Sequence, residues 1–264
     1  MSKALSIIVT TLLYSTAAAY ALKGVQEPLS GLTAPQHTFR PAVEDDLDDV
    51  VTVYIDAFKP SAAWEYSHLS DDRYANYTWT CMRKRLQEEW DNRHNISFAN
   101  VISVPQEKRS DTQRDERVVS FAAWSWKTPG EQTWPLSALR LHTLAAKCSE
   151  NLDMNLTRAA DLERQIVLAE DRYVHNVTEP QLYLGLLATH PHWDGNGFGA
   201  EQVRYGIREA ADASVPITLL ASPAGYPLYD SLGFSSLANV TFRRLDDLGV
   251  LWLEYMRWEH EGHA

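Results

Sequence analysis

The chain has 264 residues, a formal net charge of −11, 45% hydrophobic residues and 11% aromatic residues. This composition supplies enough apolar material for one packed core, or for one domain that carries an insertion. It argues against a disordered chain and, because of the strong negative charge, against a basic surface for nucleic acid.

The first 21 residues have the parts of a secretory signal peptide. Lys3 precedes an apolar run that ends on Ala19, Tyr20 and Ala21. The run is too short and too rich in Ser and Thr for a membrane span, so we expect a secreted protein with no stable span in its mature form. A helix at the start of a cytoplasmic protein is the alternative. Residues 22–36 contain Pro and Gly without periodicity and are predicted to be a linker before a domain over residues 37–264.

Two further residue types bear on the compartment. Five of the nine asparagines begin an Asn-x-Ser/Thr sequon, where chance predicts roughly one, which favours a glycoprotein. Cys81 and Cys148 are the two cysteines, and their number is compatible with one disulfide or with two buried thiols. The sequons begin at Asn76, Asn95, Asn155, Asn176 and Asn239.

The first half of the domain reads as alternating strands and helices. Acidic residues 45–49 stand beside apolar positions at helical spacing, as in the solvated first turn of a helix. Polar residues 105–117 separate two apolar runs and are predicted to be a mobile hairpin loop. The predicted strands cover residues 38–43, 98–104 and 118–126, and the predicted helices cover residues 44–58 and 71–90.

Residues 134–173 form a long stretch rich in Arg, Glu and Leu without a glycine, which predicts helix. After it, residues 181–189 are an apolar run typical of a strand, and Pro191 and three glycines then lead into a segment with helical spacing from Ala200. Further strands are predicted over residues 217–221 and 250–259, the second as the closing edge strand.

The junction between strand and helix suits an anion. The first N–H groups of a helix lack internal partners and carry the positive end of its dipole, and glycines let a phosphate approach the backbone. A plain connecting turn is the alternative. Gly199 is followed by Ala200 and Glu201 rather than Lys and Ser/Thr, so the stretch is not a P-loop, and its glycine spacing does not match a dinucleotide fingerprint.

This stretch resembles the acyl-CoA-binding motif of the GNAT superfamily of N-acetyltransferases. The motif, Gln/Arg-x-x-Gly-x-Gly/Ala, falls on residues 194–199 after the sequence LLATHP, and residues 221–234 are similar to a second block that ends in Tyr-x-x-x-Gly-Phe. The resemblance implies an α+β fold with a mixed, mostly antiparallel twisted sheet flanked by helices. It also implies that residues 131–176 are a helical insertion, which shapes a substrate pocket or only packs as a lid.

By the same resemblance, the chain transfers an acyl group from acetyl-CoA, as co-substrate, to an amine of a small-molecule acceptor, without a metal. Tyr229 matches the tyrosine that protonates the CoA thiolate, with a packing role as the alternative. Backbone groups at the end of the fourth strand would hold the pantetheine, and the glycine turn would hold the diphosphate. The cofactor-binding residues implied are Leu187, Ala188, Thr189, Asp194, Gly195, Asn196, Gly197, Phe198, Gly199 and Ala200.

The sequence departs from the family pattern at three positions. Gly185 stands where many relatives carry a carboxylate base, which leaves His190, acting through water, as a candidate base or simply as a turn residue. Asp194 replaces the usual Gln or Arg, and Asn196 replaces an often basic residue, so a carboxylate near the diphosphate lowers the expected affinity. A catalytically degenerate, secreted GNAT-fold glycoprotein that binds a ligand or partner is therefore the alternative function.

Overall fold

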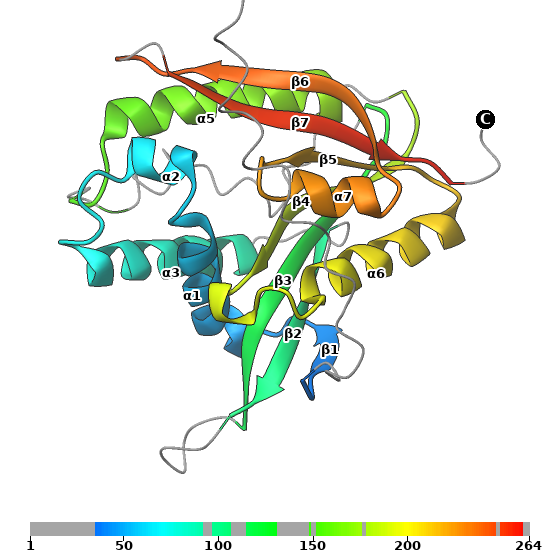
Figure 1. Ribbon diagram of the computed structural model, residues 1–264, viewed down its shortest axis with the longest axis horizontal. Helices are drawn as coiled ribbons and strands as arrows, with labels where there is room; N and C mark the ends of the chain where they lie inside the picture. Colours follow the sequence, from blue (N-terminus) through cyan, green and yellow to red (C-terminus); the bar gives the residue numbers. More distant parts are fainter. Residues whose placement is uncertain are drawn as a thin grey trace, which may run out of the picture. The chain divides into compact units, whose positions relative to one another are not determined.

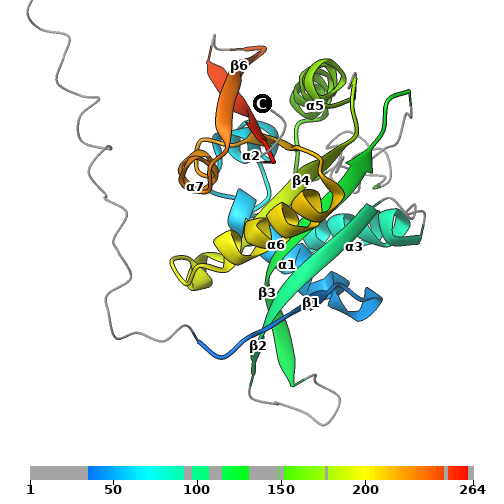
Figure 2. The same ribbon diagram turned by 90° about the vertical axis from the view of Figure 1, so that its right-hand side faces the viewer.

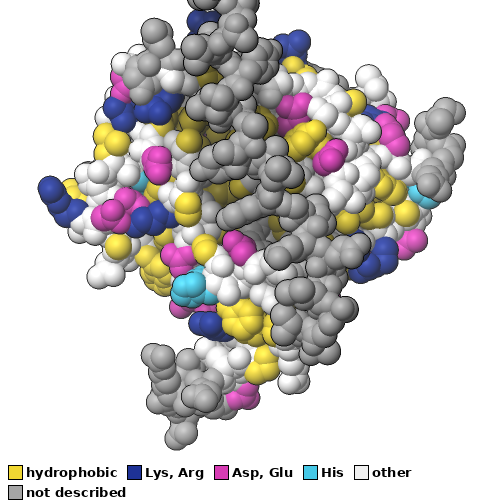
Figure 3. All heavy atoms as spheres, viewed as in Figure 1, with side chains coloured by type: hydrophobic (Ala, Val, Ile, Leu, Met, Phe, Trp, Pro, Cys, Tyr) yellow, Lys and Arg dark blue, Asp and Glu magenta, His cyan; other side chains and the backbone are white. Residues whose placement is uncertain are grey.

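The computed structural model describes residues 35–91, 97–106, 115–130, 148, 152–175, 178–246 and 249–260. The predicted signal peptide, most of the predicted linker, the predicted loop at residues 107–114 and the sequons at Asn95 and Asn176 lie outside these residues. Within them, no helix is long and apolar enough to cross a membrane. On the face drawn in Figure 3, acidic and basic side chains are interspersed with apolar ones, and the described side chains form no continuous basic area there.

A sheet of seven strands organises the domain (Figure 1), in the order β1-β2-β3-β4-β5-β7-β6. Among the described strands β4 and β5 run parallel, and all other neighbours run antiparallel. This mixed, mostly antiparallel sheet with helices on its faces confirms the predicted fold class. The strands are β1 Thr38–Pro41, β2 Ser97–Pro105, β3 Glu116–Lys127, β4 Gln181–Thr189, β5 Ile217–Ala221, β6 Ser235–Arg243 and β7 Val250–Trp258.

Helices cover both faces of the sheet (Figure 2). On one face α1 packs against β3 and β4 and against α3, and on the other face α6 packs against the same two strands. The short helix α2 contacts α5, which also contacts β6. The helices are α1 Leu47–Phe58, α2 Ala62–Ser67, α3 Ala75–Asp91, α5 Leu156–Glu170, α6 Phe198–Ala213 and α7 Tyr226–Ser231.

A glycine in α6 allows the helix to pack closely on the sheet. An ideal Cβ at Gly206 would lie 2.0 Å from Cη2 of Trp124 on β3, so a residue without a side chain is required where the indole packs on the helix. Val203 and Ala210 lie on the same buried face of α6. The start of α6 is thereby held beside the end of β4.

The C-terminal strands correct one prediction. Residues 250–259 were expected to form the edge of the sheet, but β7 lies between β5 and β6, and β6 is the edge. In β6, half-buried Ala238 and Val240 alternate with exposed residues. This pattern is hard to see in the sequence because β6 contains polar residues such as Ser235 and Ser236. Because β6 and β7 pair along nearly their whole length, the chain returns to the sheet by a hairpin.

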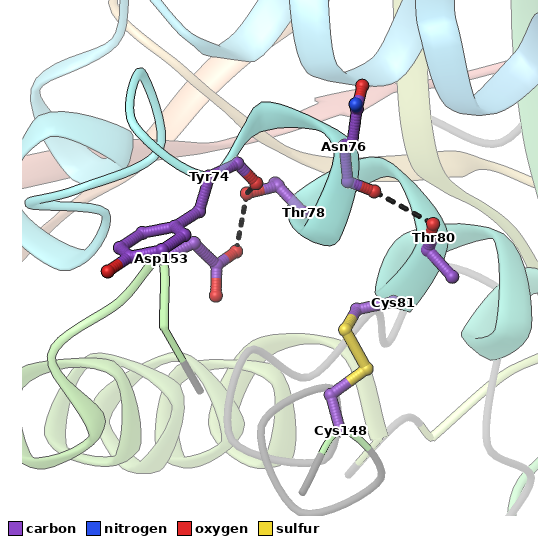
Figure 4. Close-up of a disulfide and its surroundings, with 7 residues drawn as sticks. All are labelled: Tyr74, Asn76, Thr78, Thr80, Cys81, Cys148 and Asp153. Carbon is purple, nitrogen blue, oxygen red and sulfur yellow. Dashed lines mark hydrogen bonds between the residues drawn. A yellow bond between two sulfur atoms is a disulfide. The ribbon is translucent and has the colours of Figure 1, made fainter. Parts of the chain in front are cut away.

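Cys81 of α3 and Cys148 form a disulfide with a Cα–Cα distance of 5.8 Å (Figure 4). The sequence left this pairing open. A hydrogen bond from the Thr78 hydroxyl to Asp153, 2.7 Å long, adds a second link from α3 to the segment that leads into α5. The helix α5 follows β3 and precedes β4, where the helical insertion was expected. Residues 131–147 of that insertion lie outside the described residues.

Candidate active site

The strand β4 has a free edge at its C-terminal half. It pairs with β3 from end to end, whereas its pairing with β5 ends at Leu184 opposite Leu219. In the ladder with β3, Trp124 pairs with Leu184 and Ala123 with Leu186, so Gly185 is the extra residue of a β-bulge. Beyond the bulge, Leu187, Ala188 and Thr189 have no partner residue on β5, so this edge of the β4 backbone is free of sheet pairing with β5.

Ser120 of β3 secures the other edge of this segment. Its buried hydroxyl donates to the carbonyl oxygen of Ala188 at 3.0 Å and accepts from the Thr189 hydroxyl at 3.0 Å. These bonds hold the end of β4 to β3, so the opening lies on the β5 side. Sequence reasoning missed Ser120 because it is 69 residues from Thr189 and belongs to no local motif.

A glycine turn follows the strand. After a 3₁₀ turn over Pro191–Trp193, Gly195 and Gly197 have φ angles of 79° and 81°, in the left-handed region that favours glycine. The first intrahelical hydrogen bond of α6 runs from Glu201 N–H to the Gly197 carbonyl, 3.0 Å. The N–H groups of residues 198–200 therefore precede the hydrogen-bonded ladder, at the positive end of the helix.

Two of the predicted cofactor-binding side chains have structural roles instead. Phe198 is 1% exposed and packs in the core with Ile102 and Val104, so only its backbone can face an anion. The Asn196 amide donates to the carbonyl of Trp193 at 2.9 Å and braces the turn. The predicted anion cradle is thus made of backbone and helix dipole.

The charges at the turn partly offset one another. Burial raises the pKa of the Asp194 carboxyl above its ordinary value, and His190 acts in the opposite direction. The guanidinium of Arg117 lies over the Trp193 ring, 5.7 Å from its centroid, and places a cation beside the turn. Nothing in the sequence around Arg117 pointed to this position, since it comes from the start of β3.

Gly199 lies where the turn meets the gap beside β4. An ideal Cβ there would lie 3.3 Å from Cδ2 of Leu228 on α7 and 3.9 Å from the Thr189 hydroxyl. A Cβ at Gly197 would meet no atom within 4 Å, so that position requires glycine for its φ angle rather than for space. Gly199 therefore packs closely against α7 and the end of β4.

His190 lies at the turn with both ring nitrogens engaged. Its Nδ1 accepts from the His192 N–H at 3.2 Å, and its Nε2 lies 3.1 Å from Oδ2 of Asp56 on α1. It does not line the cavity described next. This geometry favours the turn role that the sequence left open.

On the α5 side of β4 lies a cavity of about 230 Å³, called here the acceptor cavity. Its walls come from α1, α2, α5, α7, β4, β5 and β7, and it reaches the bulge at Gly185 and the ring of Tyr229. The gap beside β4 therefore separates a backbone-lined turn from a cavity lined by side chains. The described part of the insertion contributes one wall through α5.

Solved acetyltransferase structures share this architecture at low sequence identity. The structure of a histone acetyltransferase HPA2 and related acetyltransferase from Corynebacterium glutamicum aligns with a TM-score of 0.51 and 19% identity, over 85% of this chain and 96% of that chain. The chain has the GNAT fold. The putative acetyltransferase yncA from Salmonella typhimurium, solved with acetyl-CoA, aligns with a TM-score of 0.43 and 17% identity over 88% and 97% of the two chains. No protein-family model and no curated protein matches the sequence.

In this GNAT fold Tyr229 occupies the helix that follows β5. The side chain is 7% exposed, packs edge-on against Phe234 at 5.7 Å between ring centroids, and also lines the acceptor cavity. Burial raises the pKa of the Tyr229 hydroxyl, so it is protonated at neutral pH. Both of the sequence readings, packing residue and proton donor, fit this position.

A buried carboxylate lies in the wall of the cavity. The Tyr183 hydroxyl donates to Oε1 of Glu170 at 3.1 Å, and the Lys127 ammonium lies 5.8 Å from the centroid of the Tyr183 ring. Burial lowers the pKa of Lys127 to about 8, against the opposing effect of Glu170. The insertion helix of this GNAT fold thus brings a carboxylate to β4 two residues before Gly185, where the strand itself has none.

Proposed function

We propose that the chain is an acyl-CoA-dependent N-acyltransferase that moves an acetyl group from acetyl-CoA to the amine of a small molecule. The observation that supports this most strongly is the arrangement around β4. A helix start suited to a diphosphate lies on one side of β4, a partly open cavity lies on the other, and the edge of β4 beyond Leu184 lies between them.

The chain's own groups fit the steps of the transfer. The N–H groups at the start of α6 hold the diphosphate, and the free edge of β4 holds the pantetheine arm and polarises the thioester carbonyl. The amine, after losing one proton to solvent, attacks the carbonyl carbon from the acceptor cavity, a C–N bond forms and the C–S bond breaks. Tyr229 gives its proton to the departing thiolate and regains one from the nitrogen as the amide forms.

Two measurements on the full chain test the proposal. Calorimetric titration should show CoA binding with a 1:1 stoichiometry, and acetyl-CoA with a panel of amines should release free thiol. Binding of CoA without turnover on any amine would favour the non-catalytic alternative. Absence of CoA binding would overturn the assignment of the glycine turn as well.

We also propose that the protein matures in the secretory pathway as a glycoprotein. The disulfide between Cys81 and Cys148 suits an oxidising compartment, and the sequon residues Asn76 and Asn239 are exposed. Asn155 is half-buried, and its side-chain amide oxygen caps α5 by accepting from the Arg158 N–H at 3.1 Å. Catalysis there requires a luminal supply of acetyl-CoA.

Expression in a eukaryotic host, followed by intact-mass analysis with and without glycosidase, tests the proposed compartment. We expect a chain that begins near residue 22 and loses mass on deglycosylation. A full-length, unglycosylated cytosolic product would refute secretion while leaving the proposed transferase chemistry intact.

A further inference from the structure

The strand β6 forms one edge of the sheet, and among the described strands it pairs with β7 alone. An outer edge of this kind presents backbone N–H and C=O groups that can pair with another chain, and proteins usually protect it with charges, proline or a bulge. In β6 the bulge at Leu237 affects the first part of the strand, there is no proline, and the one charged residue is Arg243 at the end. Residues 239–243 are therefore a regular stretch of unprotected edge.

One face of the β6–β7 hairpin carries exposed apolar side chains. Val250 and Trp252 of β7, called here the edge patch, are 56% and 36% exposed. Thr241 lies opposite Trp252 and Arg243 lies opposite Val250, so these four side chains point to the same face. The other face is buried, since Phe242 is 3% exposed and packs where α5 lies along β6 (Figure 1). The edge patch is thus an apolar surface beside the free edge.

The sequon that begins at Asn239 lies on the same face as the edge patch. Alternate residues of a strand share a face, so Asn239 and Thr241 point to one side, and both are exposed. Asn239 lies opposite Glu254 and donates to its Oε2 at 2.8 Å. The side-chain amide has two N–H hydrogens, so this bond can persist when the other hydrogen is replaced by a sugar. Asn239 is the diagonal neighbour of Trp252, a relation that spans about 7–8 Å in antiparallel sheets.

A sugar attached at this position has the two kinds of surface that the hairpin requires. The C–H groups of a pyranose ring form an apolar face that can lie on the indole of Trp252, while its hydroxyl groups remain in water. The rest of an N-linked oligosaccharide is bulky and hydrated. It would hinder the approach of another strand to the outer edge of β6, which β6 itself does little to prevent.

We propose that Asn239 carries an N-linked glycan whose first sugar lies on Trp252 and whose remaining sugars shield the free edge of β6. The proposal rests on the proposed passage through the secretory pathway and is independent of acyl transfer. There the host's transferase supplies an oligosaccharide carried on a lipid diphosphate. Nδ2 of Asn239 attacks C1 of the first sugar, an N–C bond forms, and the C–O bond to the diphosphate breaks. One amide proton passes to a base, and the lipid diphosphate is released.

Occupancy is measured on the full chain secreted from a eukaryotic host. An amidase that releases glycans in ¹⁸O-labelled water converts each occupied Asn to a labelled Asp, which mass spectrometry of the peptides identifies. We expect label at Asn239. Label at Asn76 without label at Asn239 would refute the proposal and leave the secretory assignment intact, whereas a chain without any glycan would refute both.

Matched variants test the shielding of the edge. Asn239→Gln and Thr241→Ala each remove the sequon, whereas Thr241→Ser retains it, and Asn76→Gln removes a different one from exposed Asn76 on α3. Light scattering after size-exclusion chromatography, at increasing protein concentration, should give a higher mass for the first two variants than for the parent. Thr241→Ser and Asn76→Gln should match the parent. Equal masses for all variants would refute the shielding.

A thermal melt tests the contact with Trp252. An endoglycosidase that leaves one sugar on each Asn should leave the melting temperature of the parent unchanged, whereas Asn239→Gln should lower it by about 2–4 °C. Trp252→Thr should keep occupancy at Asn239, and adding Asn239→Gln to it should cause no further loss. A fall on trimming to one sugar, or a full effect of Asn239→Gln in the Trp252→Thr background, would overturn the proposed contact.

Discussion

The two sides of β4 are built by different means. The glycine turn comes from one continuous stretch, residues 190–200, and offers backbone N–H groups, a helix dipole and glycine φ angles. The acceptor cavity is assembled from side chains of seven elements that extend from Tyr54 to Leu253. Each side can therefore be changed without altering the other, and they share only the free edge of β4 and Tyr229.

This difference predicts separable mutants. Changes at the turn should alter the affinity for CoA and leave the affinity for the amine unchanged. Changes at α5 or its attachments should do the reverse. A change at Tyr229, which lies between the two sides, should alter turnover and leave both affinities unchanged. The four changes below test this separation.

The largest expected effect is on the attachment of the insertion. The disulfide joins positions 67 residues apart, and removing a crosslink over such a loop destabilises a domain by about 2–4 kcal/mol. Replacing Cys81 and Cys148 by Ser together should lower the free energy of unfolding by this amount. It should also weaken the binding of the amine, while the affinity for CoA stays the same in the folded protein. Denaturant unfolding measures the stability, with the chemically reduced parent as control. An unchanged midpoint would contradict the structural role of the crosslink.

Gly199→Val should abolish detectable CoA binding, a loss of about a hundredfold or more, because its side chain would crowd the start of α6 against Leu228 and Thr189, where the diphosphate is proposed to bind. Calorimetry measures the affinity. Ala213→Val, at the exposed end of the same helix, is the matched control and should bind CoA normally. Normal CoA binding by the Gly199 variant would show that CoA does not bind at the glycine turn.

Tyr229→Phe keeps the ring that packs on Phe234 but removes the hydroxyl. Turnover should fall by about a hundredfold if general acid catalysis is its main role, with CoA affinity and melting temperature nearly unchanged. The deficit should shrink as pH rises toward the thiol pKa, since the leaving thiolate then needs a proton less. Tyr226→Phe on the same helix is the control, and full activity in the Tyr229 variant would make that residue structural.

The smallest effect is expected at Asp194. Its carboxylate lies at a turn proposed to hold a diphosphate, so Asp194→Asn should tighten CoA binding by about two- to fivefold, less so at high salt. The control is Asp212→Asn, which removes an exposed carboxylate from the far end of α6. Weaker binding in the Asp194 variant would indicate that the carboxylate supports the turn rather than opposing the ligand.

The same contrast between backbone and side chains explains what the sequence could predict. Apolar periodicity located α1, α6 and the strands β1 to β5 and β7, and local glycine spacing located the turn. The edge strand β6 was missed because its polar residues obscure the alternation, and the six-residue α2 was too short for a helical pattern. The acceptor cavity could not be predicted, since contacts such as that of Tyr183 with Glu170 depend on how distant elements pack.

The most direct test of acyl transfer across the free edge of β4 uses acetyl-CoA labelled with ¹³C in the acetyl group. Incubated with the full chain and a panel of primary amines, it should give a labelled N-acetyl amide and free CoA in equal amounts by mass spectrometry, and Gly199→Val should give neither. Bound CoA and bound amine with no labelled amide, under conditions where the parent chain is folded, would contradict the proposed transferase.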